Sequence, residues 1–368
     1  MRTARAAVSE IAGGPFVLSD VDVGELRADE LLISVSAAGI CHTDLTCAAG
    51  LIPTPLPAVL GHEGAGVVLA VGAGVADVHV GERVAMTFDS CGACPSCLQA
   101  KSSYCYEFFE YNFAASRPLD ESSALSRDGI SIGSHFFGQS SFATLAVARE
   151  RNVVGVESHI PLDLVAPFGC GFQTGAGAVL CTLELPPGST LAVFGTGAVG
   201  IAAILAAVIA GASTIIGIDR VPARLQLARE LGATHTLDAS AVDVAAEIRA
   251  LTGHGVDFAL ETTGAPEVLR AAVDSLTPRG TAGVIGAPRF GTEVSLDVNT
   301  ILTGGRVVRG IVEGDSVPKL FLPKLIRYWE QGRFPVERLI RHYDFDQIGE
   351  AAADAASGAV IKPVLRMS

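Results

Sequence analysis

The chain carries little charge, and it lacks any excess of basic residues. Charged residues make up 18% of its 368 positions, hydrophobic residues make up 49%, and the formal net charge is −13. So low a charged fraction excludes a disordered chain and is typical of a well-buried globular protein. The acidic balance argues against nucleic acid or an anionic membrane as a partner. A chain of this length is expected to form two domains.

No targeting or membrane-spanning segment is evident either. No compact apolar run or cleavage site follows the arginines near the start, so no secretory signal is expected. Residues 191–218 carry no charge, but glycine, serine and threonine interrupt them at turn-like positions, which argues against a membrane span. The sequence has no internal repeat or low-complexity segment. We therefore expect a cytoplasmic protein.

Half of the eight cysteines are crowded into one short segment, at Cys91, Cys94, Cys97 and Cys105. Without a secretion signal, such a cluster indicates metal binding rather than disulfides. Four thiolates at this spacing can close a tetrahedral zinc site with no open position, which is a structural role. An iron–sulfur cluster uses similar cysteine runs and is the less favoured alternative.

The character of the sequence changes near residue 170. Before it, short alternating runs rich in β-branched residues, glycine and proline predict a mostly antiparallel β domain. From 172 to 312, apolar β-rich runs alternate with alanine-rich helical runs, which predicts an α/β fold with a doubly wound parallel sheet. The six expected strands are residues 191–194, 214–218, 234–237, 256–260, 281–285 and 307–311.

The end of the chain is expected to return to the first domain. From about 313 a helical run, 319–331, alternates with short β-like segments. The predicted division is therefore a catalytic domain of residues 1–171 and 313–368, and a dinucleotide-binding domain of residues 172–312.

A glycine-rich turn joins the first expected strand of the second domain to a helix. The turn reads Gly195-Thr196-Gly197-Ala198-Val199-Gly200. Its glycines permit a tight turn and close approach of the backbone to a pyrophosphate, and the helix N-terminus favours the anion. The motif alone is weak evidence. Its position between a strand and a helix makes Gly195, Gly197, Val199 and Gly200 candidate cofactor contacts.

An acidic residue closes the next expected strand. Asp219 lies 19 residues after Gly200, where a carboxylate accepts hydrogen bonds from the ribose hydroxyls of NAD and repels the 2′-phosphate of NADP. Arg220 and Arg224 follow, and an arginine can clamp a phosphate. We expect NAD as the cofactor, with Arg224 as a further contact, while these arginines leave the strictness of the preference open.

Three metal-ligating residues lie far apart in glycine-flanked turns, at Cys41, His62 and Cys170. Two cysteines and a histidine are the protein ligands of a catalytic zinc that keeps its fourth position open. Each residue alone is weak evidence, because a lone cysteine or histidine is usually a structural residue. No second histidine follows His62-Glu63 at helical spacing, which argues against a zincin protease. Together with the dinucleotide motif, the trio predicts a metal-assisted alcohol oxidoreductase.

These motifs together closely resemble the zinc-dependent medium-chain alcohol dehydrogenases, over essentially the whole chain. In family order they are residues 39–44 (GICHTD), 61–66 (GHEGAG), the four-cysteine lobe, 169–175 (GCGFQTG) and 195–200 (GTGAVG). Residues 310–316, 332–335 and 361–365 resemble the aryl-alcohol (benzyl alcohol) dehydrogenase branch. The resemblance implies a mostly β, GroES-like catalytic domain and a Rossmann domain.

The resemblance also implies roles around the catalytic zinc. Cys41, His62 and Cys170 would hold the metal, and Glu63 would lie behind it at the same site. Asp44 would accept a hydrogen bond from His62 and so fix the tautomer of its ring. Thr43 would receive the proton of the substrate hydroxyl.

Further roles concern the cofactor. By resemblance, His42 would face the pyrophosphate and Lys362 would reach it from the end of the chain. Thr174 and Val199 would press on the nicotinamide ring. One position departs from the liver-type relatives, which carry a proton-relaying histidine three residues after the proton-accepting hydroxyl. Here that position is Thr46, so the exit route of the proton stays unassigned.

The activity that the resemblance implies is reversible oxidation of primary aromatic or allylic alcohols to aldehydes, with hydride transfer to NAD and two zinc ions per chain. A broad-specificity or glutathione-dependent formaldehyde-type dehydrogenase is the alternative. The partners would be a small alcohol or aldehyde and further copies of the chain, as a homodimer or homotetramer. Aromatic residues near the cysteine lobe either line an aryl pocket or pack the lobe: Tyr104, Tyr106, Phe108, Phe109, Tyr111 and Phe113.

Overall fold

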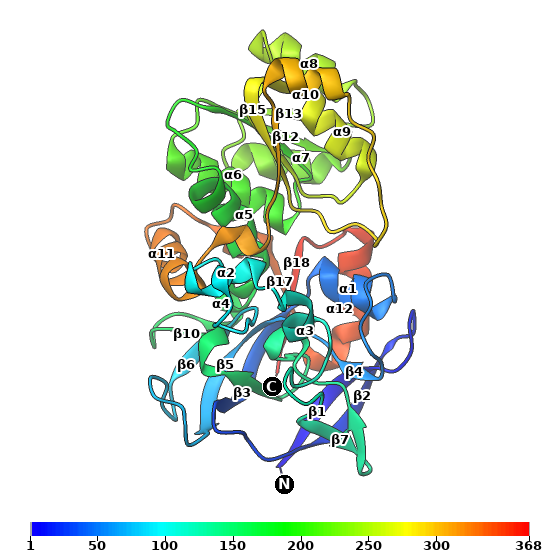
Figure 1. Cartoon of the computed structure of the whole chain (residues 1–368), viewed down its shortest axis with the longest axis vertical. Coiled ribbons are helices and arrows are strands. Elements are labelled where there is room, and N and C mark those ends of the chain that lie inside the picture. Colours follow the sequence, from blue (N-terminus) through cyan, green and yellow to red (C-terminus); the bar gives the residue numbers. More distant parts are fainter. Residues whose placement is uncertain (1, 368) are drawn as a thin grey trace. The chain divides into compact units, whose positions relative to one another are not determined.

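The computed structural model describes residues 2–367, and its chain divides into two compact units. The first comprises Met1–Cys170, Val317–Arg327 and Pro335–Ser368, and the second comprises Gly171–Ser316 and Tyr328–Phe334 (Figure 1). The sequence placed residues 313–316 and 328–334 in the first domain, whereas in the structure they group with the second unit. One reason is that the turn Glu313–Asp315 packs against a helix, Gly171–Gly177, that belongs to the second unit.

The first unit is built on two sheets. One has five strands in the order β4-β1-β2-β7-β8, and the other has seven, in the order β10-β6-β5-β3-β18-β17, with β9 also paired to β3. Apart from the parallel pair β17–β18, the paired strands run antiparallel. The strands are β1 Arg2–Ser9, β2 Phe16–Val23, β3 Glu30–Gly39, β4 Ala58–Val59, β5 Glu63–Val71, β6 Arg83–Met86, β7 Leu125–Arg127, β8 Ile130–Ile132, β9 Leu145–Arg149, β10 Val153–Gly155, β17 Ile340–Asp344 and β18 Lys362–Arg366.

Strand β3 has apolar residues buried on both faces of its sheet. Successive side chains of a strand point to opposite faces. Leu31, Ile33 and Val35 are buried in one hydrophobic cluster, whereas Leu32 and Ala38 are buried in another. The strand therefore lies between two cores, which fixes its register and positions the turn that follows it. The helices of this unit are α1 His42–Ala48, α2 Pro95–Leu98, α3 Phe108–Asn112, α4 Leu162–Val165, most of α11 Pro318–Glu330, and α12 Ile348–Ser357.

The second unit is a six-stranded parallel sheet in the order β13-β12-β11-β14-β15-β16. This order, with a reversal between β11 and β14, confirms the predicted doubly wound fold. Its strands are β11 Thr190–Phe194, β12 Thr214–Asp219, β13 His235–Asp238, β14 Val256–Glu261, β15 Leu276–Val284 and β16 Val307–Gly310. Its helices are α5 Gly171–Gly177, α6 Ala198–Ala210, α7 Pro222–Glu230, α8 Val244–Thr252, α9 Pro266–Asp274 and α10 Val298–Gly304.

Strand β15 begins five residues before the predicted start at 281, because Pro278 and Gly280 obscure the β pattern there. The chargeless run 191–218 forms β11, α6 and most of β12, which are largely buried. Among the described residues no single helix is long and apolar enough to cross a membrane. One bent pair, Leu162–Gly169 with Gly171–Thr182, passes by length and composition only.

Candidate active site and metal centres

Three segments of the first unit bring Cys41, His62 and Cys170 together. Cys41 is the N-cap of α1, two residues after the end of β3. His62 directly precedes β5, and Cys170 follows the short helix Ala166–Gly169. One ligand atom from each of the three lies within 4.8 Å of the others. Residues separated by as many as 129 positions thus meet, two of them beside strand ends and one after a short helix.

The imidazole of His62 is held at one edge by a hydrogen bond and is stacked on one face by an aromatic ring. Its Nδ1 lies 2.7 Å from Oδ1 of Asp44, and both side chains are fully buried. Asp44 also accepts hydrogen bonds from the backbone N–H groups of Cys41 and Gly61. The ring of Phe137 stacks on the imidazole with a centroid distance of 4.4 Å. These contacts set both the tautomer and the orientation of the ring.

The donor set fits zinc. With Nδ1 engaged by Asp44, Nε2 of His62 is a buried nitrogen without a hydrogen-bond partner in the described structure, and it lies within reach of both thiols. Such a nitrogen is costly unless a ligand satisfies it. A hydrogen bond from Cys170, opposed by burial and reinforced by His62, holds the pKa of Cys41 well below its ordinary value. A thiolate is the form of cysteine that binds metal.

Two hydroxyl groups lie on α1 close to this trio, and they differ in their bonding. Oγ1 of Thr43 lies 3.9 Å from Sγ of Cys41. Oγ1 of Thr46 donates to the backbone carbonyl of His42 at 2.8 Å, one helical turn back, and its side chain is buried. Thr43 is therefore the hydroxyl beside the ligand atoms, whereas the proton of Thr46 is held by the backbone.

The four clustered cysteines form a second candidate metal centre in the same unit. Ligand atoms of Cys91, Cys94, Cys97 and Cys105 all lie within 4.8 Å of one another. Backbone N–H groups point at the sulfurs, including that of Cys94 to Sγ of Cys91 at 3.2 Å and that of Cys91 to Sγ of Cys105 at 3.3 Å. Hydrogen bonds from the backbone of Tyr106 and Cys97 lower the pKa of Cys94 to about 6. Four cysteine donors and no open position suit a structural zinc.

The glycine-rich turn of the second unit has the geometry that a pyrophosphate site needs. Gly195 has φ of +92°, and a Cβ on Gly200 would lie 1.8 Å from the carbonyl oxygen of Gly195. Gly197 is the N-cap of α6. No side chain fits at Gly200, so the turn and the helix can approach as closely as they do. The first N–H groups of α6 lack intrahelical acceptors and can bind an anion.

Asp219 closes β12 and also holds this turn. Its Oδ2 accepts hydrogen bonds from the backbone N–H and the hydroxyl of Thr196, at 2.8 and 2.9 Å. Its Oδ1 accepts from the backbone N–H groups of Arg220 and Val221. Arg224 lies in the first turn of α7. The carboxylate thus joins the glycine-rich turn to the end of β12, in addition to its predicted role toward a ribose.

Comparison with known proteins shows which family the chain belongs to. Residues 27–158 match the model of the alcohol dehydrogenase GroES-like domain, and residues 198–327 match that of the zinc-binding dehydrogenase domain. A geraniol dehydrogenase from Castellaniella defragrans is 44% identical over 364 residues, which cover 99% of this chain and 97% of that protein. The chain belongs to the zinc-dependent medium-chain alcohol dehydrogenase family. It is an alcohol dehydrogenase whose cofactors are zinc and a nicotinamide dinucleotide.

Two solved structures are similar along their whole length. One is an alcohol dehydrogenase zinc-binding domain protein from Burkholderia ambifaria, 51% identical with a TM-score of 0.97, matching 100% of this chain and 99% of that one. The other is a benzyl alcohol dehydrogenase from Acinetobacter calcoaceticus, 43% identical with a TM-score of 0.97 and full coverage of both chains.

One residue predicted to contact the cofactor of this alcohol dehydrogenase has buried partners within the chain. Nζ of Lys362 lies 2.8 Å from both carboxylate oxygens of Glu63 and 3.3 Å from the carbonyl of Ile40. The expected contact of Lys362 with the pyrophosphate stays a prediction. Burial opposes its charge, but the Glu63 carboxylate more than compensates and raises the pKa of Lys362 above its ordinary value. A fully buried carboxylate needs such a partner. Lys362 therefore neutralises Glu63.

The same contact settles where Glu63 lies. Its carboxylate faces Lys362, and it is not one of the three residues whose ligand atoms cluster. The expectation that Glu63 lies behind the metal at the same site stays a prediction. His42 is exposed at the start of α1, and Thr174 is buried on α5 of the second unit.

Sequence reasoning missed two features of the dehydrogenase. Phe137 was given no role, yet it stacks on His62 from a turn in which His135 and Phe137 both have positive φ, +63° and +51°. Glu313 was noted only as part of a branch motif, yet its buried carboxylate contacts Gln173 and Thr174. A phenylalanine in the left-handed region has no sequence signature, but a buried acid inside a glycine-containing motif could have been noticed.

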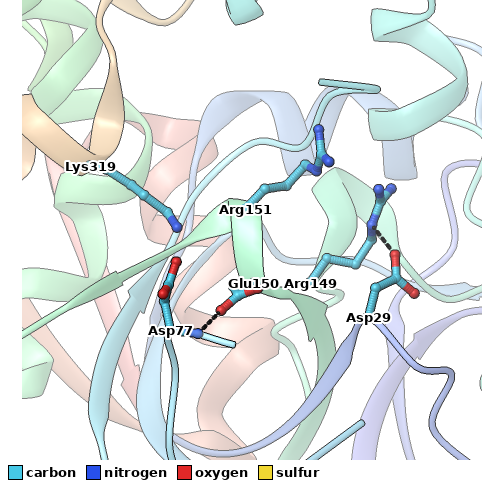
Figure 2. A pocket seen from close by; sticks show the side chains of 6 residues that line it. All are labelled: Asp29, Asp77, Arg149, Glu150, Arg151 and Lys319. Atoms are coloured by element: carbon cyan, nitrogen blue, oxygen red, sulfur yellow. Dashed lines mark hydrogen bonds and ion pairs between the residues drawn. The ribbon is translucent and has the colours of Figure 1, made fainter. Parts of the chain in front are cut away.

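The first unit also has a surface pocket of about 160 Å³ (Figure 2). Its lining contains none of the clustered cysteines and consists of charged residues: Asp29, Asp77, Arg149, Glu150, Arg151 and Lys319. Its charges oppose one another: Arg149 pairs with Asp29 at 3.2 Å, and Glu150 accepts hydrogen bonds from the backbone of Ala76 and Asp77. Arg149 also reaches Asp89 at 3.1 Å. The balanced charges and internal pairs indicate a structural brace of the first unit rather than a ligand site.

Proposed function

We propose that this alcohol dehydrogenase oxidises primary allylic or aromatic alcohols to aldehydes, reversibly and with NAD. The supporting observation is a group of phenylalanine rings that adjoins the candidate zinc ligands. Phe137 stacks on His62, and Phe136 meets the same imidazole edge-on at 5.7 Å. Phe113 and Phe108 extend the group, with ring centroids 5.0 and 6.5 Å from that of Phe137. Flat unsaturated groups pack well against such rings.

The two named relatives agree with this substrate class. Geraniol dehydrogenase and benzyl alcohol dehydrogenase, by their names, act on an allylic and an aromatic alcohol, and each is more than 40% identical to this chain. Both substrates place the reacting hydroxyl one carbon from a π system. An apolar, aromatic wall beside the metal ligands would favour such alcohols over short aliphatic ones, because it contributes more buried contact to them.

In the proposed reaction, each candidate site residue of the first unit has a separate role. Cys41, His62 and Cys170 would hold a zinc ion, which when bound supplies Lewis acidity and lowers the pKa of an alcohol hydroxyl. Thr43 would accept the hydroxyl proton, because its Oγ1 lies beside the ligand atoms. Asp44 would keep Nδ1 of His62 protonated and Nε2 available. The nicotinamide ring is the acceptor of the hydride.

We propose NAD rather than NADP as the cofactor because Asp219 stands at the end of β12. A carboxylate at this position would repel a 2′-phosphate, and its hydrogen bonds to the turn hold it there. We also propose that the protein acts in the cytoplasm as a homodimer or homotetramer. Strand β16 is the last in its sheet, and its Val307 and Val308 are 46% and 39% exposed. A second copy would cover this edge.

The proposal is tested with a kinetic panel of benzyl alcohol, geraniol, hexan-1-ol and ethanol, each with NAD and with NADP. We expect kcat/KM to be at least about ten-fold higher for the unsaturated alcohols, since a small difference in apolar contact is worth about 1–3 kcal/mol. We also expect a higher kcat/KM with NAD than with NADP, because the Asp219 carboxylate would repel the 2′-phosphate. A preference for ethanol would contradict the proposed substrate class. Turnover of hydroxymethylglutathione above that of benzyl alcohol would instead support the formaldehyde-type alternative.

A further inference from the structure

Gln139 is a buried polar residue whose side chain contacts the backbone of one candidate zinc ligand. Only 1% of its surface is exposed. Its Nε2 donates hydrogen bonds to the backbone carbonyls of His62, at 3.0 Å, and of Thr87, at 3.2 Å. Its Oε1 accepts a hydrogen bond from the backbone N–H of Gly64 at 3.0 Å. Both amide hydrogens are therefore used, and the three bonds fix which end of the amide is the oxygen.

These bonds extend the sheet at the first residue of β5. The carbonyl and the N–H group that Gln139 engages lie on either side of Glu63. One residue of a neighbouring parallel strand would bond to β5 in the same way. The described pairing of β6 with β5 covers residues 65–67. The side-chain amide of Gln139 therefore takes the place of a strand at the start of β5 and holds the backbone of His62 there.

The turn that carries Gln139 runs along the segment before His62. The backbone N–H of Ser141 donates to the carbonyl of Gly61 at 2.9 Å. A Cβ on Gly61 would lie 2.5 Å from the backbone nitrogen of Phe142, and Gly61 has φ of +91°. Glycine alone permits both this conformation and so close an approach. The glycine before the histidine thus allows the turn to bring the Gln139 amide to it.

The same amide is linked to a second candidate ligand through Thr87. The hydroxyl of Thr87 donates to the carbonyl of Gly169 at 2.7 Å, and Gly169 directly precedes Cys170. A Cβ on Gly169 would lie 1.9 Å from the carbonyl oxygen of Met86, so the two backbones touch. All of these residues belong to the first unit. Gln139 is therefore connected to the segment of Cys170 by two consecutive hydrogen bonds.

Asp44 and Gln139 together hold the three candidate ligands. Asp44 joins the backbone of Cys41 to the imidazole of His62. We propose that Gln139 is a positioning residue that sets the spacing between His62 and Cys170, and with it the affinity and coordination geometry of the catalytic metal site. Ligands that are held in place beforehand bind a metal more tightly, because less has to be ordered on binding. This role depends neither on the alcohol nor on the dinucleotide that the enzyme uses.

The experiment replaces zinc with Co²⁺, whose visible absorption bands report the coordination geometry. Imidazole can bind only at the site with an open position, so its effect on the spectrum separates that site from the four-cysteine site. Q139M removes the amide and keeps the length of the side chain. We expect it to raise the Co²⁺ dissociation constant of the imidazole-responsive site roughly ten-fold and to shift its bands. An unchanged constant with unchanged bands would overturn the proposal.

Asn112 provides the matched control, because its fully buried amide also makes three hydrogen bonds to backbone groups. Its Nδ2 donates to the carbonyls of Asp89 and Phe108, and its Oδ1 accepts from the N–H of Asp89. N112L should lower the urea midpoint of unfolding about as much as Q139M, but it should leave the imidazole-responsive site unchanged. An equal effect of both variants on that site would indicate a general loss of packing and overturn the proposal.

T87V tests the connection to Cys170 without altering Gln139. The variant removes the hydroxyl that donates to Gly169 and keeps the backbone carbonyl that accepts from the amide. We expect the Co²⁺ constant of the imidazole-responsive site to rise by a few-fold, as loss of one hydrogen bond predicts. If Q139M does not fold, an unchanged constant in T87V would still overturn the proposal. An unaltered protein without an imidazole-responsive Co²⁺ would refute the catalytic metal site itself, and the proposal with it.

Discussion

Nζ of Lys362 lies 2.8 Å from both carboxylate oxygens of Glu63, and both side chains are buried beside the candidate zinc ligands. The pair joins residues 299 positions apart, the start of β5 and the start of β18. Removing one member of a buried pair leaves the other charge without compensation, whereas removing both is far less costly. This relationship gives the first prediction.

K362M should lower the free energy of unfolding by about 3–5 kcal/mol, because Glu63 then remains buried and unpaired. The double variant E63Q/K362M should recover most of that loss. Urea denaturation at pH 7 measures both. R366M is the matched control: Arg366 is in the same strand but pairs with Asp163 near the surface, so its loss should cost less than about 1 kcal/mol. A double variant as unstable as K362M would contradict the pairing.

The sequence could predict which three candidate zinc ligands come together, because the signal of each is local. Cys41, His62 and Cys170 each lie in a short glycine-flanked motif, and glycine turns at strand ends need no tertiary information to be noticed. The pairing of Lys362 with Glu63 was not predicted, because it is set by how β18 pairs with β3, antiparallel and next to β5. No local pattern encodes that pairing.

The doubly wound sheet was equally predictable, since its alternation of apolar strands and alanine-rich helices repeats several times within one segment. The positive-φ turns at His135–Phe137 and Glu313–Asp315 were not predictable. Their conformations contradict the backbone preferences of the residues involved, so only the surrounding packing produces them. Both turns present a side chain to a predicted site residue: Phe137 to His62 and Glu313 to Thr174.

A second prediction concerns the contact between Asp44 and His62. D44N should weaken zinc binding at the catalytic position by about 10–100-fold, because the amide can no longer accept from Nδ1 as strongly and fix the tautomer. Competition with a chelator, followed by elemental analysis, measures the loss. D346N is the control, since Asp346 is exposed and pairs only with exposed Arg5 in the described contacts. Unchanged retention of both metal equivalents in D44N would exclude the predicted role.

A third prediction distinguishes the two hydroxyl groups of α1. T43V should lower kcat by at least about 10²-fold with zinc content and NADH affinity unchanged, because a positioned proton acceptor contributes that much. T43S should retain most of the activity. T46V is the matched control: its hydroxyl donates to the carbonyl of His42, so its loss should change kcat by only a few-fold. A larger effect of T46V than of T43V would assign the proton route to Thr46.

The buried carboxylate of Glu30 gives a prediction for acid stability. Burial raises its pKa, but hydrogen bonds from His135, Arg117 and the backbone of Arg27 outweigh burial and lower the pKa well below the ordinary value. Because the folded value is lower than the unfolded one, the stabilisation is complete above about pH 4.3 and is lost as the pH falls toward the folded value.

Urea denaturation between pH 7 and pH 3 tests the direction in which stability changes with pH. The free energy of unfolding should fall with acid, and E30Q should be less stable at pH 7 with a shallower fall below pH 4.3. E82Q provides the comparison, because the Glu82 carboxylate is 41% exposed and meets only an exposed histidine in the described ion pairs. If the free energy of unfolding of E30Q fell with pH as steeply as that of the unaltered protein, Glu30 would not contribute to acid stability.

The last prediction tests the proposed pairing of chains through β16. Leu302 and Val298 on α10 are each 74% exposed, close in sequence to the edge strand whose Val307 is 46% exposed. If a second copy covers this surface, L302E together with V307K places charges in an apolar interface and should shift the protein to monomers in sedimentation experiments at micromolar concentration. L119E alters an exposed leucine of the first unit, 86% exposed, and should leave the assembly intact.

The monomeric L302E/V307K variant should also unfold at a lower temperature, because its sheet edge is exposed to water. Its unfolding midpoint should no longer rise with protein concentration. Assembly that survives L302E/V307K but fails in L119E would place the interface on the first unit instead.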